Sequence, residues 1–393
     1  MDRIYLDNAA TSWPKPESVY TAVDHALRVN GAAAGRGGYQ QVIDSMRMVE
    51  HTRGLVAKLI NAPSHKNLAF TFNGTDSLST AIFGLLKPGD HVVTSVVEHN
   101  SVLRPLKYLE ANSDISLTIV GCDQTARINE DEIAASIKPN TRLVVLNHVS
   151  NVTGTIQPIE NVKSVIQSSK CKNAVFLLDA AQSLGHIPID VQAIGCDILA
   201  APGHKGLLGP LGTGILYVTE EVTHSIAPLR YGGTGSDGSR EFQPTEMPDR
   251  FEAGNLNVSG IAGVGAGIKF LQSDCGLAAH DHRHRLSARL LKGIHEISGI
   301  SLQGPQSMDD RLGVFSLSIG GFDCHEAASI LDSNWMIQTR SGLHCAPLIH
   351  RTLGSESEHG TIRLSVGLFN TIAQIEETLV ALEQLAAQSS TDS

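Results

Sequence analysis

Two neighbouring stretches, AVFLLDAAQ (residues 174–182) and DILAAPGHKG (residues 197–206), have the same layout. Each is a short apolar run that ends on small and polar residues. An apolar run this short, without alternating polar residues, is typical of a strand buried on both faces of a parallel sheet. The layout therefore predicts two strands whose carboxyl ends carry Asp179 and Lys205, at the edge where open α/β sheets bind ligands.

Similar runs recur on both sides of these two stretches and alternate with amphipathic segments. The predicted strands are 68–72, 91–97, 115–120, 143–147, 175–178 and 198–201, and the predicted helices between them are 46–60, 77–86, 103–111, 129–137 and 162–169. This alternation indicates an α/β fold with a mostly parallel sheet and helices on both faces.

The pattern changes after about residue 220. Residues 231–250 are rich in Gly, Ser, Asp and Pro, which predicts a long loop. Beyond it, helices are predicted at 280–297, 325–332 and 372–387, and a strand at 314–319. We therefore expect the C-terminal third to form a smaller α+β domain.

Composition narrows the class of protein. The 393 residues include 30 Lys and Arg against 40 Asp and Glu, a net charge of −10, and 41% are hydrophobic. This hydrophobic share excludes an extended disordered chain, and the acidic balance provides no global attraction to nucleic acid. No apolar run reaches the ~18 residues of a membrane span. The six cysteines lack C-x-x-C spacing, so neither a zinc site nor a disulfide framework is indicated, and we expect a soluble cytoplasmic protein.

Asp179 and Lys205 are the first candidate functional residues. A carboxylate that follows a buried strand is costly to bury unless a cation meets it. A lysine between glycines can lose its proton and form a Schiff base with a carbonyl. The alternatives are a helix cap or structural salt bridge for Asp179 and a surface turn for Lys205.

A third candidate is the segment 73–76 (NGTD), between a predicted strand and helix. Free N–H groups at a helix N-terminus bind anions, although an ordinary N-cap has the same appearance. Taken together, an anion site, a buried carboxylate and a reactive lysine fit the phosphate, the ring nitrogen and the aldehyde of pyridoxal 5'-phosphate.

In its ordered motifs the whole chain resembles the cysteine desulfurase and selenocysteine lyase family. This family has the class-V aminotransferase fold (fold type I of the pyridoxal phosphate enzymes). The motifs that carry the resemblance are YLDNAAT (5–11), EHN (98–100), HVSNVTG (148–154), LDAAQ (178–182), GHK (203–205), RFEAG (250–254) and RSGLHCA (340–346). The resemblance implies a large cofactor-binding domain of residues 13–258 and a small domain of residues 1–12 and 259–393.

The resemblance also assigns roles at the cofactor. Lys205 would carry the covalent link and move the substrate α-proton, and Asp179 would keep the ring nitrogen protonated. Gln182 would bond the ring hydroxyl, and His99 would stack on the ring and shuttle protons. The phosphate would be held by Gly74, Thr75 and His204.

Two positions depart from the family pattern. Pro202 stands where relatives have a phosphate-binding serine, and Asn255 stands where relatives have a threonine that reaches the neighbouring subunit's phosphate. Because proline has no side-chain donor, one phosphate contact is expected to be missing or replaced.

Cys345 decides the reaction type. By resemblance it is the persulfide-forming cysteine of the subgroup with a short, ordered cysteine loop, and His344 or Arg340 would favour its thiolate. The implied reaction converts L-cysteine to L-alanine and leaves a persulfide on Cys345. Arg363 would bind the substrate carboxylate. Asn151 would contact the same carboxylate or the cofactor, and Arg340 is a further candidate at the substrate.

The resemblance further implies a homodimer and a sulfur acceptor, a protein or a small thiol. The alternatives are selenocysteine as substrate, another reaction of the same fold (aminotransferase, epimerase or carbon–sulfur lyase), and a non-catalytic scaffold. A metal site at His280, His282 and His284 is not expected, because residues i, i+2 and i+4 cannot all face one side of a helix.

Overall fold

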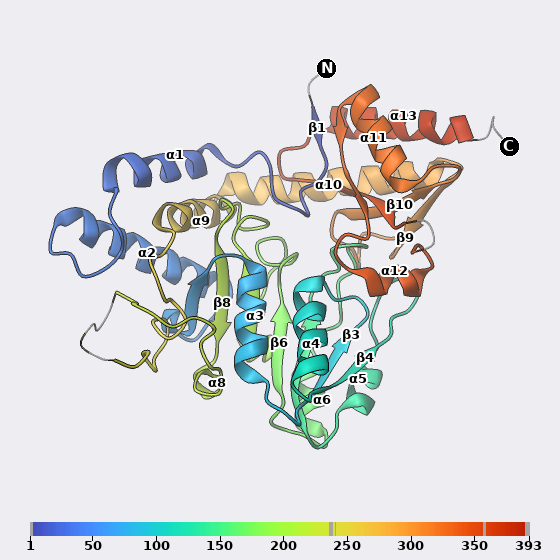
Figure 1. Cartoon of the computed structure of the whole chain (residues 1–393). Helices are drawn as coiled ribbons and strands as arrows, with labels where there is room; N and C mark the ends of the chain where they lie inside the picture. The colour runs from blue at the N-terminus through green and yellow to red at the C-terminus, as the bar shows by residue number, and fades with distance from the viewer. Residues whose placement is uncertain (1–2, 236–238, 240, 357–358, 390–393) are drawn as a thin grey trace.

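The computed structural model describes residues 3–235, 239, 241–356 and 359–389. Within these residues the chain forms two main sheets, one large and one small, with helices packed around each (Figure 1). None of the helices in the described ranges combines the length and apolar character that crossing a lipid bilayer requires.

The large sheet has seven strands and is mostly parallel, as predicted. Its strands lie in the order β2 (Leu68–Thr71), β8 (Gly214–Val218), β7 (Ile198–Pro202), β6 (Val175–Asp179), β5 (Thr141–Asn147), β3 (His91–Ser95) and β4 (Ser116–Val120). Only β8 runs antiparallel to its neighbours, β2 and β7. The sequence analysis did not predict β8. The segment 203–213 connects it to β7 without a crossover helix, so the two strands pair in opposite directions.

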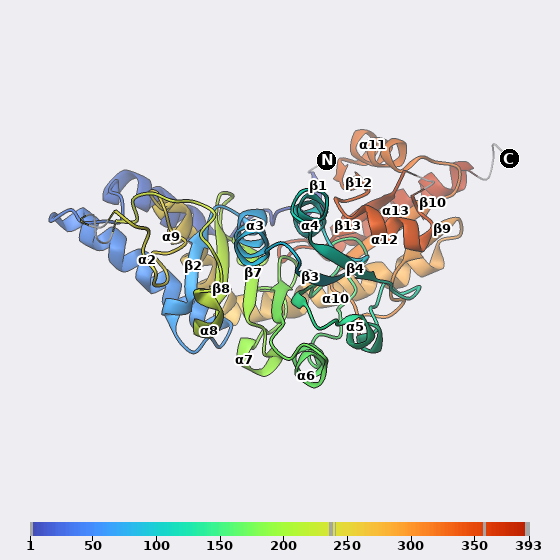
Figure 2. The ribbon, with the colours of Figure 1, turned by 60° about the horizontal axis from the view of Figure 1, so that its bottom comes forward.

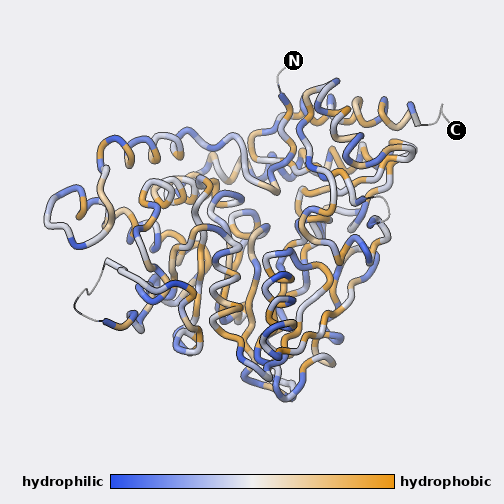
Figure 3. The backbone as a smooth tube through the Cα atoms, in the orientation of Figure 1, coloured by the Kyte–Doolittle hydropathy of each residue, from blue (hydrophilic) through white to orange (hydrophobic). Residues whose placement is uncertain are grey.

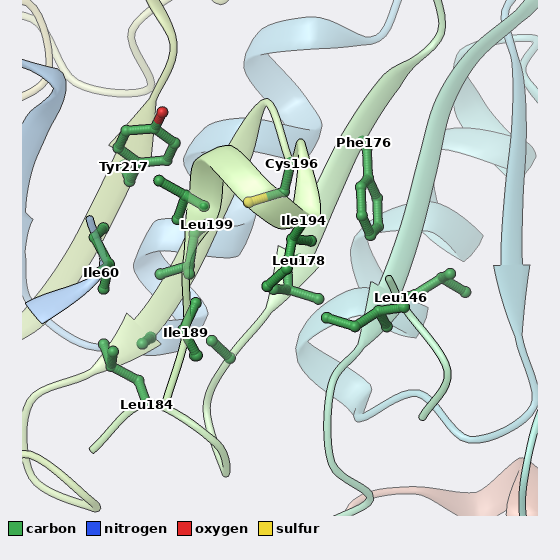
Figure 4. Close-up of a cluster of buried hydrophobic side chains, with 14 of the residues drawn as sticks. Ile60, Leu146, Phe176, Leu178, Leu184, Ile189, Ile194, Cys196, Leu199 and Tyr217 are labelled. Atoms are coloured by element: carbon green, nitrogen blue, oxygen red, sulfur yellow. The ribbon is translucent and has the colours of Figure 1, made fainter. Parts of the chain in front are cut away.

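Alternate side chains of these strands enter two separate cores. On one face, Val175 and Leu177 pack under α3 (Gly74–Leu85) and α4 (Asn100–Asn112). On the other face, Phe176 and Leu178 pack with Leu199 and Tyr217 (Figure 4). This second face is covered by α2 (Gln40–Leu59), α5 (Glu130–Ser136), α6 (Val162–Ser168), α7 (Val191–Ile194) and α9 (Val258–Leu271). Figure 2 shows helices on both sides of the sheet, and Figure 3 shows its apolar strands between them.

The remaining N-terminal and connecting elements are short. They are α1 (Glu17–His25), the π-helical turn η1 (Ala26–Asn30), the 3₁₀ turn η2 (His65–Asn67) and α8 (Glu220–Thr223). Residues described between 224 and 257 form no regular helix or strand, which confirms the loop predicted at 231–250.

The small sheet is antiparallel, with the order β12 (Arg340–Gly342), β13 (Thr361–Ser365), β10 (Val314–Ile319) and β9 (Ile300–Gln303). It packs with α10 (Asp274–Glu296), α11 (Cys324–Trp335) and α13 (Ile372–Ser389), and α12 (Pro347–Leu353) lies beside it. The N-terminal strand β1 (Ile4–Tyr5) pairs in parallel with β11 (Ile337–Gln338), and Ile4 and Leu6 lie in the small core.

The predicted division at residue 258 stays a prediction, and the packing bears on it in two ways. Pairing of β1 with β11 agrees with grouping residues 1–12 with the C-terminal part. However, Ile261, Val264 and Ile268 of α9 are buried in the core of the large sheet. We therefore propose that the boundary lies after α9, near residue 272.

Helix starts are where the sequence analysis was least accurate. The predicted helix 103–111 begins at Asn100 because His99 caps it, and the predicted helix 280–297 begins at Asp274 because Ser273 caps it. Both caps accept a hydrogen bond from a backbone N–H of the first turn, which extends the helix by several residues.

A buried ion pair explains the RFEAG motif. The Arg53 guanidinium binds Glu252 through its two terminal nitrogens, with Nη1–Oε1 and Nη2–Oε2 distances of 2.6 and 3.0 Å. Glu252 Oε1 also accepts from the N–H of Phe70 over 2.6 Å. Glu252 therefore fastens the 250–257 segment to α2 and β2 and has a structural role.

Candidate functional site

A cavity lies at the carboxyl ends of β6 and β7. Its empty volume is about 540 Å³, including space open to solvent. The residues that the sequence predicted to hold a cofactor all line it: Gly74, Thr75, His99, Asn151, Asp179, Gln182, His204 and Lys205.

Lys205 and Asp179 face the same buried space. Burial lowers the pKa of Lys205 to about 8, although the nearby Asp179 carboxylate acts in the opposite direction. Burial also raises the pKa of Asp179. The Ala181 N–H, which donates to Asp179 Oδ1 over 2.9 Å, acts to lower that pKa but does not outweigh burial. A substantial neutral fraction of Lys205 is thus present near neutral pH, as attack on a carbonyl requires. Within the described residues, no cation lies at salt-bridge distance from Asp179, and a protonated ring nitrogen would supply one.

The start of α3 forms the predicted anion site. The Asn73 side chain caps the helix by accepting from the Asp76 N–H over 2.9 Å. The N–H groups of Gly74 and Thr75 come just before the Asp76 N–H in the first turn of α3. No helical turn precedes them, so they have no carbonyl acceptor within the helix. A Cβ atom at Gly74 would lie 3.1 Å from Pro202 Cδ, so the backbone packs directly on the proline ring. This tight cradle suits a phosphate group.

His204 and Gln182 lie on the cavity wall with polar atoms available. The Nδ1 atom of His204 is buried and has no partner among the described residues, and burial lowers the pKa of His204 to about 4. Gln182 donates from Nε2 to the carbonyl of Ala9 over 2.9 Å. This bond orients the amide so that its oxygen is free to accept.

His99 is a neutral imidazole in this site. Its Nδ1 accepts a hydrogen bond from the Ser101 N–H over 3.0 Å, so the ring proton is on Nε2. Burial, and then Lys205 and three surrounding arginines, lower the pKa of His99 to about 4. Any role that requires a stable imidazolium is therefore disfavoured here.

Cys345 lies on a short loop between β12 and α12 and is not itself among the residues that line the cavity. His344 and Cys345 both have positive φ, 48° and 60°, a conformation that is strained for residues other than glycine. The loop is held by the Asn100 N–H, which donates to the Cys345 carbonyl over 2.7 Å, and by Asn151 Nδ2, which donates to the His344 carbonyl over 2.7 Å. The cysteine loop is therefore short and ordered, as expected.

The structure distinguishes the two residues proposed to favour the thiolate. The Nη2 atom of Arg340 is 3.7 Å from Cys345 Sγ. His344 is buried, and its Nε2 pairs with Thr361 Oγ1 over 3.0 Å. Burial lowers the pKa of His344 well below its usual value, so the prediction for His344 was wrong, and Arg340 is the cation that faces the sulfur.

Arg363, the predicted carboxylate-binding residue, is buried on β13 beside Asn151. Its Nη1 donates to the Asn151 carbonyl over 3.1 Å, and its Nη2 donates to Asp7 Oδ1 over 2.7 Å. The Nε of Arg363 and the Oδ1 of Asn151 are buried without partners among the described residues. Both side chains therefore have unused polar atoms for a ligand.

The sequence analysis did not single out Asp7 or Ser101. Asp7 is the carboxylate that holds Arg363, and Ser101 bridges His99 and Thr75. Asp7 falls in a quoted motif, and Ser101 follows His99 by two residues at a helix start, which was the only available signal. Asn255 is exposed and lies outside this cavity.

The three histidines 280, 282 and 284 lie on α10. The His280 ring packs edge-on against His186, whereas His282 Nε2 pairs with the Asn370 carbonyl over 3.0 Å. These two imidazoles thus have different partners. In the described part of the chain, three metal-ligating side chains come together only at Asp323, Cys324 and His325, at the start of α11.

Comparisons with known proteins agree with this geometry. The class-V aminotransferase family model matches residues 4–378. A relative from Methanothermobacter thermautotrophicus, named "Probable cysteine desulfurase", is 35% identical over 390 residues, which cover 98% of this chain and 95% of the relative. A cysteine desulfurase of Yersinia pestis is 30% identical over 390 residues and covers 97% and 93%.

The fold is shared with solved structures. An apo cysteine desulfurase from Thermococcus onnurineus has a TM-score of 0.90 and 33% identity, over 98% of this chain and 95% of that chain. A cysteine desulfurase from Escherichia coli has a TM-score of 0.86 and 26% identity over the same shares. With these matches over nearly its whole length, the chain belongs to the class-V aminotransferase family and, within it, to the cysteine desulfurases.

Proposed function

We propose that this protein is a pyridoxal 5'-phosphate-dependent cysteine desulfurase that converts L-cysteine to L-alanine and forms a persulfide on Cys345. The observation that carries the proposal is the bonding of the Cys345 loop to the start of α4 and to Asn151, which lines the cavity. The loop backbone is bonded to Asn100, next to His99, and to Asn151. These bonds tie the loop of the proposed nucleophile to elements that contribute His99 and Asn151 to the cavity of Lys205, which supports the proposal.

The cavity residues fit the cofactor by their chemistry. A Cβ atom at Gly74 would crowd Pro202 Cδ at 3.1 Å, and buried polar atoms of His204 and Asn151 lack partners among the described residues. A cationic ring nitrogen would compensate the buried Asp179 carboxylate. When bound, pyridoxal phosphate supplies an electron sink that labilises bonds at the substrate α- and β-carbons.

The protein's own residues would perform the remaining tasks. Lys205 would hold the cofactor and then move the α-proton, which its pKa of about 8 allows. Arg363 would bind the substrate carboxylate, with Asn151 beside it and Arg340 near the reacting sulfur. Neutral His99 would stack against the cofactor ring and offer Nε2–H as a donor.

In the net reaction the carbon–sulfur bond of L-cysteine breaks and a sulfur–sulfur bond forms on Cys345. The thiol and L-cysteine together give the enzyme persulfide and L-alanine, so atoms and electrons balance without an external oxidant. A second thiol, on an acceptor protein or a small molecule, would then remove the sulfur. The short loop limits how far Cys345 itself can carry it.

The test is mass spectrometry of the protein after incubation with L-cysteine, alongside an alanine assay. We expect an added sulfur on Cys345 and one alanine per persulfide before an acceptor is added. Cys345→Ser should abolish both. If Cys345→Ser still releases alanine at the wild-type rate, Cys345 is not the sulfur carrier and a different reaction of the same fold applies.

Selenocysteine turnover and cofactor binding separate the desulfurase from a selenocysteine lyase and from a non-catalytic scaffold. Preferential release of selenide from selenocysteine would favour the lyase. A wild-type protein that never binds pyridoxal phosphate would favour the scaffold. The relatives named as cysteine desulfurases favour the desulfurase.

We further propose a homodimer. Large apolar side chains are exposed on η1, at the start of α2 and in the 231–250 loop, including Leu27, Tyr39, Tyr231 and Phe242, which is 86% exposed. These segments lie on the same side of the molecule, away from the small sheet (Figure 1). Light scattering should give twice the chain mass of 41.9 kDa.

A reducing, cytoplasmic location is also part of the proposal. All six cysteines are free, and Cys345 must be a thiol at the start of each cycle.

A further inference from the structure

Ser101 lies between two residues of the cofactor cavity. Its Oγ is 2.7 Å from Thr75 Oγ1 and 2.9 Å from His99 Nδ1, and its backbone N–H donates to the same Nδ1 over 3.0 Å. The residue is only 8% exposed and lines the cavity. The Ser101 hydroxyl thus connects the imidazole to the phosphate end of the site.

Hydrogen counting selects one direction for this chain of bonds. Nδ1 of neutral His99 has a single lone pair, and the Ser101 N–H, whose direction is fixed by the backbone, already occupies it. The Ser101 hydroxyl proton is then free to point to Thr75 Oγ1. In this arrangement the Thr75 hydroxyl keeps its own proton for the cavity.

The reverse direction would disable Thr75 as a donor. If the Ser101 hydroxyl donated to Nδ1, the Thr75 proton would point to Ser101 Oγ and only lone pairs would face the cavity. A phosphate dianion repels lone pairs and accepts hydrogen bonds. An anion at the start of α3 therefore favours the direction from Ser101 to Thr75.

Thr75 matters here because the cavity wall next to Gly74 is Pro202, which has no side-chain donor. We propose that Ser101 is a positioning residue whose hydroxyl orients the Thr75 hydroxyl proton toward the cofactor phosphate, offsetting the donor that Pro202 lacks. The proposal rests on the proposed function, since it assumes that pyridoxal phosphate occupies the cavity.

Ser101→Ala separates this role from a structural one. The variant keeps the backbone N–H that donates to His99 Nδ1, the cap of α4, and so keeps the His99 tautomer. It removes only the hydroxyl. The readout is the ratio of two dissociation constants of the cofactor-free chain, for pyridoxal phosphate and for pyridoxal, measured by absorbance titration. Pyridoxal has the same ring and aldehyde but lacks the phosphate.

We expect Ser101→Ala to raise the dissociation constant of pyridoxal phosphate about 10-fold and that of pyridoxal less than about 2-fold. Thr75→Ala should cause the same selective loss, and the double variant should lose no more than Thr75→Ala alone. Ser101→Thr, which restores a hydroxyl, should recover the ratio. As a matched control, Ser77→Ala removes a buried hydroxyl of α3 that bonds Thr71 and should leave the ratio unchanged.

If Ser101→Ala weakens the binding of both ligands equally, or changes the binding of neither, the proposal is overturned and the proposed function stays intact. A wild-type chain that binds neither ligand would instead overturn the proposed function itself. If Ser101→Ala does not fold, Ser101→Gly provides the second hydroxyl-free variant for the same comparison.

Discussion

Glu98 provides the sharpest test of the electrostatics around the site. This carboxyl is fully buried, and its Oε1 accepts from Ser95 Oγ over 2.6 Å and from the Asn147 N–H over 3.1 Å. Its Oε2 has no partner among the described residues. Burial, reinforced by the nearby Asp179, raises the pKa of Glu98 to about 8. We therefore expect Glu98 to be protonated in the folded protein at neutral pH.

The sign of the pH dependence follows from this shift. Between pH 4.5 and about 8 the folded state holds a proton on Glu98 that the unfolded state has released. Folding stability attributable to Glu98 therefore falls as pH rises through this window and is constant above it. At about 1.4 kcal/mol per pKa unit, the full loss is at most about 5 kcal/mol.

Glu98→Gln should remove this dependence. The amide is a neutral isostere whose oxygen can keep both hydrogen bonds, and Asn147 Oδ1 is a buried acceptor without a partner among the described residues. We expect little change in unfolding free energy at pH 5 and a gain of several kcal/mol over wild type at pH 8.5.

The assay is urea unfolding of both proteins at half-unit steps from pH 5 to 9. Glu252→Gln is the matched control, because it removes a charge from the buried pair with Arg53 and should destabilise the protein at every pH in this range. A difference between wild type and Glu98→Gln that does not grow with pH would refute the reasoning. So would a loss above about 2 kcal/mol at pH 5.

Three further predictions concern the site. Pro202→Ser adds a hydroxyl to the cavity wall and should tighten pyridoxal phosphate several-fold in a titration, and an equal effect of Pro202→Ala would contradict this. Asp7→Asn removes the only carboxylate bonded to Arg363 in the described structure. Because Asp7 is partly exposed and solvent screens the pair, the loss of unfolding free energy should be about 2–4 kcal/mol. Urea unfolding without such a loss would argue against the pair. Arg340→Met removes the cation 3.7 Å from Cys345 Sγ and should slow iodoacetamide alkylation of that cysteine several-fold, whereas an unchanged rate would exclude this role.

Much of the fold could be predicted because it depends on local patterns. The central strands β6 and β7 of the large sheet are buried on both faces, so each contains an apolar run that is visible in the sequence. The exception was β8, whose antiparallel direction depends on how the 203–213 segment connects it to β7 rather than on its own residues.

The candidate site could be predicted in part. Asp179 and Lys205 end adjacent parallel strands, so their proximity follows from topology. The partners of Cys345 and Arg363 did not follow in this way. His344 is next to Cys345 in sequence, yet it points to Thr361, while the more distant Arg340 faces the sulfur.

By itself, therefore, the sequence determined the class of fold, the residues that end the strands, and, through the ordered motifs, the family. Only the tertiary structure decided which side chains meet: Asp7 with Arg363 across 356 residues, and Thr75 with Ser101 at the starts of two helices. The physical reason is that helices and strands depend on the spacing of apolar residues over short stretches, which can be recognised in the sequence. The direction of a polar side chain, by contrast, is set by which buried donor or acceptor the packed core leaves within about 3 Å of it.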